Sequence, residues 1–313
     1  MTQSSKDEQG TKNFRAGFAA IIGEPNVGKS TLLNAVLGEK LSIVTRKPQT
    51  TRRQILGIYS SEECQIVFVD TPGIMRPKYK LHNAMLEAAN SASHDADVIV
   101  FMIDAFRYAK KQVLLKDDLA FQQVSKLPQP IILVVNKIDL IKQDELIVLL
   151  DRCAKEFDFK EIVPLSALTG LNVGELVRAI YPYLPDPVPL YPTDMLSTAP
   201  ERFFVSELVR EKIFELFSEE IPYSTEVEVE EFKEQFEKEG KKDLIRCAVV
   251  VERESQKAIL IGKKGSAIKR LGEAARKEIE AFLQRPVYLE LFVKVRPNWR
   301  EKETQLRHFG YKT

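Results

Sequence analysis

The 313-residue chain is poor in the residues that build disulfide scaffolds and Cys/His metal sites, with three cysteines and three histidines. Cys64, Cys153 and Cys247 lie far apart and not in metal-ligand spacing. An odd, sparse set of cysteines is typical of a reducing cytosol rather than of a disulfide framework. His82 and His94 have no ligand partners nearby in the sequence, so we interpret both as structural or surface residues.

Long apolar runs and an excess of one charge are also missing. No apolar stretch approaches the roughly 20 residues needed to cross a bilayer. Residues 1–13 are polar without an apolar segment, so we expect a disordered tail and not a signal peptide. Hydrophobic content of 44%, charged content of 29% and a net charge of +1 are ordinary for a soluble globular protein. The length allows two domains.

The most informative stretch is Gly23-Glu-Pro-Asn-Val-Gly-Lys-Ser30, between an apolar run at 18–22 and a helical pattern at 31–37. Strand, glycine loop and helix in this order are the context of a Walker A phosphate loop. The glycines let backbone N–H groups point at phosphate oxygens, and the helix adds its positive dipole end. The alternative is a chance glycine turn. Lys29 can reach the β- and γ-phosphates, and Ser30 can ligate Mg²⁺. The predicted GTP-binding residues of this stretch are Gly23, Asn26, Val27, Gly28, Lys29, Ser30 and Thr31.

Two further segments are expected beside the phosphates. The polar loop 47–53 would lie over the nucleotide, and its threonines are candidates for a second hydroxyl ligand of Mg²⁺, although a plain surface loop is an equal alternative. Asp70-Thr-Pro-Gly73 follows the apolar strand 64–69. Asp70 would hold the metal through water, and the N–H of Gly73 would sense the γ-phosphate.

A third motif, Asn136-Lys-Ile-Asp139, follows the apolar strand 131–135 and predicts guanine specificity. Asp139 can accept from both N1–H and the 2-amino group of guanine, a donor pair that adenine lacks. Asn136 would fix the loop and the base edge, and the stem of Lys137 would cover the ring. After a short strand at 162–165 come Ser166, Ala167 and Leu168, where the Ala167 N–H is a candidate donor to guanine O6.

Strands that alternate with helices, with ligand residues at their carboxyl ends, predict a doubly wound α/β sheet for residues 14–184. Six prolines between 182 and 200 indicate a stiff linker at 185–200. From residue 201 the pattern becomes α+β, in the order helix, strand, strand, helix, helix, strand. This is the order of a type II KH domain, predicted over 201–297 and followed by a tail at 298–313.

The Gly262-Lys-Lys-Gly265 turn between two predicted helices is where a KH domain clamps a nucleic-acid backbone. Cations crowd this part of a nearly neutral chain, which favours nucleic-acid binding over the alternative of a solvated helix with a glycine corner. The predicted RNA contacts are Lys257, Gly262, Lys263, Lys264, Gly265, Lys269 and Arg270. In the tail, Trp299, Phe309 and Tyr311 lie among cations and could either stack on bases or pack onto the domain.

Taken together, these motifs, with Pro48-Gln-Thr-Thr-Arg52 and Val251-Glu-Arg-Glu-x-Gln-Lys257, resemble the Era family of bacterial GTPases over about residues 14–311. The resemblance implies a cytoplasmic, monomeric GTPase with GTP/GDP and Mg²⁺. It implies binding to the 3′ end of small-subunit rRNA and assistance in 30S subunit biogenesis, with some peripheral association with the inner face of the cell membrane. Lys29, Thr51 and Gly73 would be catalytic, Thr51 rather than Thr50 would be the switch threonine that ligates Mg²⁺, and Asn26 would position a potassium ion.

The residue after Asp-x-x-Gly is Ile74, which can neither orient nor deprotonate water. We therefore expect slow intrinsic hydrolysis that depends on a bound cation, a backbone-held water or the ribosome. A metabolic phosphotransferase is a second hypothesis, but it has no need of the guanine motif. A passive RNA-binding protein with a structural nucleotide is a third and would bind without turnover. A tandem GTPase is excluded, because the chain carries one set of motifs.

Overall fold

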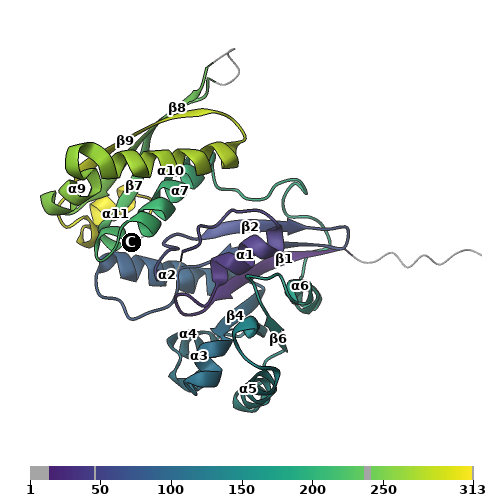
Figure 1. Ribbon diagram of the computed structural model, residues 1–313. Coiled ribbons are helices and arrows are strands. Elements are labelled where there is room, and N and C mark those ends of the chain that lie inside the picture. Colours follow the sequence, from purple (N-terminus) through teal and green to yellow (C-terminus); the bar gives the residue numbers. More distant parts are fainter. Residues whose placement is uncertain (1–13, 46, 236–240, 312–313) are drawn as a thin grey trace, which may run out of the picture.

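A computed structural model describes residues 14–45, 47–235 and 241–311. Within these residues the chain forms a six-stranded sheet, in the order β2-β3-β1-β4-β5-β6, and a three-stranded sheet, in the order β7-β8-β9 (Figure 1). The predicted disordered tail at 1–13 lies outside the described residues. No helix among the described residues combines the length and the apolar character needed to span a membrane.

The larger sheet is parallel except at one edge. Its strands are β1 Arg15–Ile22, β2 Ile55–Ser60, β3 Cys64–Asp70, β4 Val98–Asp104, β5 Ile131–Asn136 and β6 Glu161–Leu165. Only β2 runs antiparallel to its neighbour, β3. Because the carboxyl ends of parallel strands share one edge, the segments after β1, β3, β5 and β6 are brought together there, as the motifs predicted.

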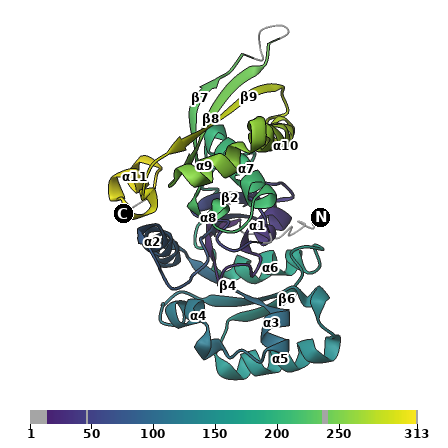
Figure 2. The same cartoon turned by 60° about the vertical axis from the view of Figure 1, so that its left-hand side comes forward.

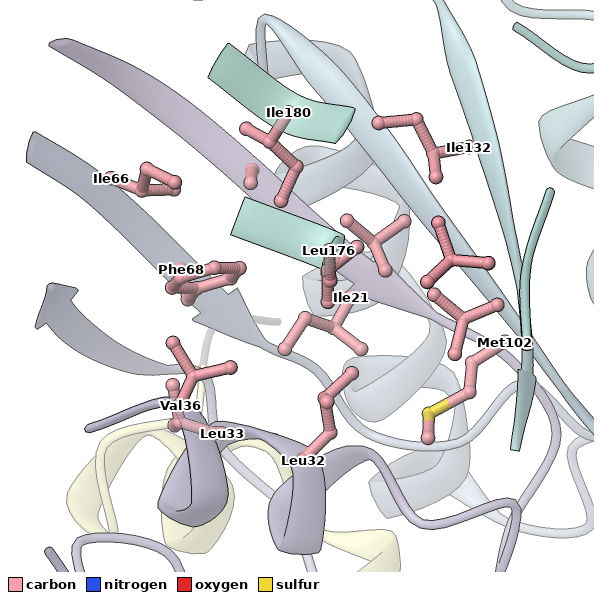
Figure 3. Close-up of a cluster of buried hydrophobic side chains, with 14 of the residues drawn as sticks. Ile21, Leu32, Leu33, Val36, Ile66, Phe68, Met102, Ile132, Leu176 and Ile180 are labelled. Carbon is pink, nitrogen blue, oxygen red and sulfur yellow. The ribbon is translucent and has the colours of Figure 1, made fainter. Parts of the chain in front are cut away.

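Helices cover both faces of this sheet. On one face lie α1 Lys29–Leu37 and α6 Val173–Ile180, whose apolar side chains meet those of the strands in the cluster of Figure 3. On the other face lie α2 Lys80–Asp95, α3 Ala105–Lys110, α4 Leu119–Val124 and α5 Gln143–Glu156. Neighbouring strand residues such as Ile21 and Ile22 therefore enter opposite cores. The predicted doubly wound fold is confirmed.

The second sheet has one helical layer packed against one face. The elements are α7 Glu201–Leu216, α8 Ile221–Ser224, β7 Glu226–Lys233, β8 Asp243–Val251, α9 Glu254–Ile261, α10 Ser266–Leu283 and β9 Val287–Val295. β8 pairs antiparallel with β7 and parallel with β9. Apart from the short α8, this is the predicted order of a type II KH domain. The side chains of α7 and α10 form its core with the strands.

The carboxyl-terminal aromatic residues pack and do not face solvent. Trp299, Phe309 and Tyr311 are at most 7% exposed. With α11 Glu303–His308 they form a cluster that also contains Leu81 and Met85 of α2 and residues of β8. Of the two predicted roles for these rings the structure supports packing, because buried rings present no face to a base. Base stacking by these three rings was the wrong alternative.

The proline-rich segment 185–200 is attached to the larger sheet. Ala16 and Asp186 exchange backbone hydrogen bonds of 2.7 and 2.9 Å. The Gln65 side chain accepts from the N–H groups of Leu190 and Tyr191, and Ile58 of the edge strand donates to the Leu196 carbonyl over 2.8 Å. These contacts restrain the linker along the sheet before α7 begins.

Candidate nucleotide site and nucleic-acid interface

Two glycines of the phosphate loop are required by space. A Cβ at Gly28, whose φ is +106°, would lie 2.4 Å from the side-chain nitrogen of Asn136, and a Cβ at Gly23 would lie 2.4 Å from the Met102 carbonyl. Helix α1 begins at Lys29 without a side-chain cap. Its first N–H groups are therefore open to an anion, which is the environment that a nucleotide phosphate needs.

Lys29 is buried at the floor of this loop. Its Nζ donates to the carbonyl oxygens of Gly23 and Glu24 over 3.1 and 3.0 Å. Burial lowers the pKa of Lys29 to about 8, against the opposing effect of the Asp70 and Asp118 carboxylates. A phosphate group in the loop would supply a further counter-charge and raise the pKa of Lys29 again.

Three oxygen-bearing side chains from separate segments meet beside Lys29. Ser30 Oγ lies 2.8 Å from Thr51 Oγ1 and donates to Asp70 Oδ2 over 2.7 Å. Thr50 faces elsewhere, since its Oγ1 donates to the Lys47 carbonyl over 2.9 Å. The geometry therefore favours Thr51 over Thr50 as the second hydroxyl.

The same oxygens fit Mg²⁺. Asp70 Oδ1 is buried without a hydrogen-bond partner, and burial raises the pKa of the Asp70 carboxyl. Two hydroxyls and a carboxylate are hard oxygen donors of the kind that Mg²⁺ prefers. Sequence reasoning missed Ser42, whose Oγ also donates to Asp70 Oδ2 over 3.0 Å. Ser42 belongs to no motif, so the sequence carried no signal for it.

The segment after β3 lies directly against the phosphate loop. A Cβ at Gly73 would lie 2.7 Å from the backbone of Pro25, so only glycine allows this approach. The Ile74 N–H donates to the Gly23 carbonyl over 3.1 Å. The Ile74 side chain is 2% exposed and belongs to the core beneath α2 and α3. It is directed away from the phosphates and cannot hold a water there.

Asn136 joins three of the predicted segments. Its Nδ2 donates to the Val27 carbonyl over 2.7 Å, and its Oδ1 accepts from the Ala167 N–H over 2.9 Å. Asn136 thus ties the phosphate loop to the Ser166-Ala-Leu turn, as its predicted loop-fixing role requires. The Ala167 N–H, predicted as a donor to guanine O6, is engaged by this amide, so it would have to be shared with a base.

The remaining base-site residues surround this link. Lys137 has a φ of +65° and its Nζ bridges Asp104 Oδ2 and the Asn26 carbonyl over 2.6 and 2.7 Å. Asp139 is exposed. Ser166 is buried and receives the Thr169 N–H on its Oγ over 3.3 Å. The Leu168 side chain is 80% exposed, and Thr31 lies in the first turn of α1.

A cavity lies where the phosphates are expected. Its walls come from the phosphate loop with the start of α1, from the segment before β2, and from Gly73. The lining residues are Pro25, Asn26, Gly28, Lys29, Ser30, Thr31, Ile43, Val44, Thr45, Gln49, Thr50, Thr51 and Gly73. The predicted polar loop therefore covers the phosphate loop instead of extending into solvent, and the surface-loop alternative is wrong. Among the described residues, no three His, Cys, Asp or Glu side chains gather as a metal cluster.

The predicted RNA clamp has the backbone that its glycines require. Gly262 and Gly265 have φ values of +71° and +79°, and Lys264 between them has +53°. Helix α10 begins at Ser266 without a side-chain cap, so its first N–H groups are open to a phosphate. Beside the turn, a groove between α10 and β9 is lined by Lys269, Arg276 and the half-exposed Tyr288, among others.

The predicted cations surround this turn. Lys263, Lys264, Lys269 and Arg270 are exposed, and Lys257 on α9 is partly exposed. All belong to α9, to the turn or to the first turn and a half of α10, and therefore lie close to the clamp. Sequence reasoning missed Tyr288, whose ring is 59% exposed. Its position next to the buried Val287 on a strand could have indicated an exposed ring, because successive strand side chains point to opposite faces.

Fold and site together define a P-loop GTPase joined to a KH domain. Residues 18–137 match a family described as 50S ribosome-binding GTPase, and residues 220–300 match the KH domain family. Over 300 residues the chain is 47% identical to GTPase Era of Geotalea uraniireducens and 44% identical to that of Geotalea daltonii, covering 96% of this chain and 99% of each relative. The chain belongs to the GTPase Era family.

Solved structures agree with this assignment. The chain is similar to a crystal structure of Aquifex aeolicus Era, bound to GDP and AlF4⁻, with a TM-score of 0.87 and 43% identity. It is also similar to a crystal structure of Era in complex with MgGDPNP and nucleotides 1506–1542 of 16S ribosomal RNA, with a TM-score of 0.88 and 43% identity. Both cover 96% of this chain and 100% of the other.

Proposed function

We propose that this protein binds and hydrolyses GTP, binds the 3′ end of small-subunit ribosomal RNA, and uses the two activities together in 30S subunit biogenesis. The observation that carries the proposal is the meeting of Ser30, Thr51 and Asp70 beside Lys29, because four residues from three distant segments converge on one phosphate site. The description of the first matched family names the 50S subunit. We favour the small subunit because the full-length similarity is to an Era structure that holds 16S RNA.

In the proposed reaction Lys29 leaves the loop carbonyls and binds the β- and γ-phosphates, while Gly73 offers its N–H to the γ-phosphate. Ser30 and Thr51 would hold Mg²⁺ directly, and Asp70 would hold it through water. Bound Mg²⁺ would neutralise developing charge on the phosphates. Since Ile74 is directed into the core, no side chain at that position activates the water, and slow intrinsic turnover follows.

Guanine selection is assigned to Asp139, with Asn136, Lys137, Ser166, Ala167 and Leu168 shaping the base site. The exposed Asp139 carboxylate is available for the paired donors of guanine. Adenine would leave it without those donors. We expect GTP and GDP to bind and ATP to be rejected.

The deciding experiment measures nucleotide binding and phosphate release by the full chain. We expect turnover of GTP and none of ATP. Asp139→Ala should raise the Kd for GDP by about 100-fold or more, because the lost pair is charge-assisted and bidentate. Asp144→Ala, an exposed acid at the start of α5, is the matched control and should bind normally. Binding of GTP without any phosphate release would instead favour the passive RNA-binding alternative.

RNA binding is assigned to the Gly262–Gly265 turn with Lys257, Lys263, Lys264, Lys269 and Arg270. The open amides at the start of α10 and the exposed cations support a backbone clamp. We further propose a GTPase domain over 14–184, a linker over 185–200, and a KH domain over 201–297 with its packed tail.

We place the activity in the cytoplasm, which three buried cysteines with free thiols support. Potassium binding at Asn26, peripheral membrane association and a monomeric state stay predictions from the resemblance.

A further inference from the structure

A segment between α1 and β2, residues 40–45 and 47–53, is here named the switch segment, and it touches α7 and α8 of the second domain. Figure 2 shows α8 on the side of the second domain that meets the first. Near the start of the switch segment, Lys40 Nζ donates to Glu211 of α7 over 2.7 Å and the Val44 N–H donates to the same carboxylate over 3.0 Å. The contacts on either side of Thr51 are more informative.

Arg52 fills the carboxyl-terminal end of α8. Its two terminal nitrogens donate to the carbonyl oxygens of Thr225, Pro222 and Tyr223 over 2.6, 2.9 and 3.1 Å. The Arg52 side chain is 3% exposed and also meets Glu226 at 3.3 Å. These carbonyls have no partner inside the helix, so they need an outside donor, and a cation is favoured at a helix carboxyl terminus.

Lys47 does the same at α7. Its Nζ donates to the carbonyl oxygens of Phe214 and Phe217, where that helix ends. The switch segment thus places one cation before Thr50 and one after Thr51, each at the carboxyl-terminal end of a different KH-domain helix. Together with contacts inside the first domain, Lys47 and Arg52 fix the backbone of the residues between them, which include Thr51.

Thr51 is bonded directly to Arg52, so the Cα atoms of the two residues are only about 3.8 Å apart. A hydroxyl must be placed within a few tenths of an ångström to ligate Mg²⁺, since this ion demands near-ideal octahedral geometry. The Arg52 guanidinium is fixed by three carbonyls and a carboxylate of the second domain. The position of Thr51 beside Ser30 therefore depends on that domain.

We propose that Arg52 and Lys47 are positioning residues for the triphosphate site. Through them the carboxyl-terminal ends of α7 and α8 hold Thr51 beside Ser30, so the KH domain completes the metal-binding site of the GTPase domain. The inference rests on the proposed function and adds to it the residues through which the second domain acts on nucleotide binding. GDP lacks the γ-phosphate, so its affinity should depend little on Thr51.

The test compares Kd values of the full chain for GDP and for a non-hydrolysable GTP analogue, both with Mg²⁺. Arg52→Ala should raise the Kd for the analogue about tenfold and leave that for GDP within about twofold. Lys47→Met, which keeps the aliphatic stem, should give the same selectivity at about threefold. Lys80→Ala is the matched control: Lys80 joins the domains elsewhere, through Glu303 on α11, and both Kd values should stay unchanged.

If Arg52 and Lys47 had a purely structural role, their variants would bind GDP and the analogue more weakly by the same factor. That result would overturn the inference, and so would unchanged Kd values in both variants. If Arg52→Ala fails to fold, the milder Lys47→Met decides, because normal GDP binding shows that its GTPase domain is intact. A wild-type protein that binds neither guanine nucleotide would overturn the proposed function and this inference together. Selective loss of the analogue supports both.

Discussion

At the scale of single residues, His82 shows how a side chain with no catalytic role can link two loops of the site. Its Nδ1 accepts from the Lys78 N–H over 3.2 Å, so Nε2 carries the proton and donates to Gln49 Oε1 over 3.0 Å. Gln49 belongs to the switch segment and Lys78 to the loop after Gly73. His82 was predicted to be structural or at the surface, and it is structural.

The neutral state of His82 predicts a pH dependence of stability. Burial, and then the charges of Arg52, Arg300 and Lys78, lower its pKa to about 4 from an ordinary 6.5. Between pH 6.5 and pH 4 the unfolded chain binds a proton at this position and the native one does not, so stability falls as the pH falls through this window. With allowance for solvent, the loss from pH 7 to pH 5 should be about 1 kcal/mol.

Urea unfolding of the wild type and of His82→Gln at both pH values measures this contribution. Glutamine keeps a side-chain amide donor for Gln49 but does not titrate. We expect the wild type to lose about 1 kcal/mol more than the variant between pH 7 and pH 5. Equal losses would mean that the pKa of His82 is the same in the native and the unfolded chain.

At the scale of elements, the turn between α9 and α10 predicts different roles for its two glycines. Gly262 has φ +71° and ψ +177°, a region open essentially to glycine alone, and a Cβ there would lie 2.7 Å from the Ala267 Cβ. Gly265 has φ +79° and ψ +10°, and a Cβ would meet nothing within 4 Å. Gly262 therefore shapes the turn, whereas Gly265 leaves open space where a backbone can approach.

Alanine at the two positions should separate these roles. Gly262→Ala should destabilise the protein by about 3 kcal/mol through strain and a clash, and Gly265→Ala by about 1 kcal/mol through left-handed strain alone. Trp299, the single tryptophan, lies buried against β8, so its fluorescence in urea follows this domain. Equal costs would contradict the assignment of Gly262 as the shaping residue.

The sequence predicted those elements whose pattern is continuous. The strands predicted at 64–69 and 131–135 became β3 and β5, each one residue longer at its carboxyl end. The short strand predicted at 162–165 became β6, one residue longer at its amino end. The helices α3 and α4, of six residues each, were missed because they are too short for a helical period to stand out. Their only local signals are the capping residues Asp104 and Asp118.

Long-range contacts could not be predicted in this way. The phosphate loop, Asp70 and the guanine motif were found because a local spacing carries each of them, and parallel strands bring them to one edge. Arg52 and Thr225 are 173 residues apart in the sequence, and no local pattern predicts their contact. For the same reason the role of the aromatic tail stayed open until Trp299 and Tyr311 were placed against their neighbours.

At the scale of the whole molecule, the two domains meet through an ionic cluster rather than an apolar seam alone. Glu226, 1% exposed, faces Arg52, Arg53 and the phenol of Tyr311. The charge of Arg53 and then those of Arg52 and Arg210 hold the pKa of Glu226 below its ordinary value, against the effect of burial. Such a cluster tolerates little displacement, because separating its members leaves buried charges unpaired. The interface therefore favours discrete orientations over a continuous range.

An interface of this kind predicts that nucleotide and RNA affinities depend on each other. If the triphosphate state favours one domain orientation, an oligonucleotide of the 16S rRNA 3′ end should bind more tightly with a GTP analogue than with GDP at one fixed salt concentration. Coupling of this type is commonly worth 1–3 kcal/mol, so we expect a factor of about ten. The RNA must then tighten binding of the analogue relative to GDP by the same factor, because linkage is reciprocal.

Gly265→Asp is the control that separates the two halves of this prediction. A carboxylate in the open space at Gly265 repels the RNA backbone and should abolish RNA binding, while GDP affinity stays normal because the turn lies outside the nucleotide site. Arg52→Ala should leave RNA affinity in the GDP state unchanged and remove the tenfold difference between the nucleotides. Equal RNA affinity in both nucleotide states of the wild type would contradict the coupling. In that case the cluster around Glu226 would hold one orientation throughout, and the GTP site and the RNA clamp would act independently.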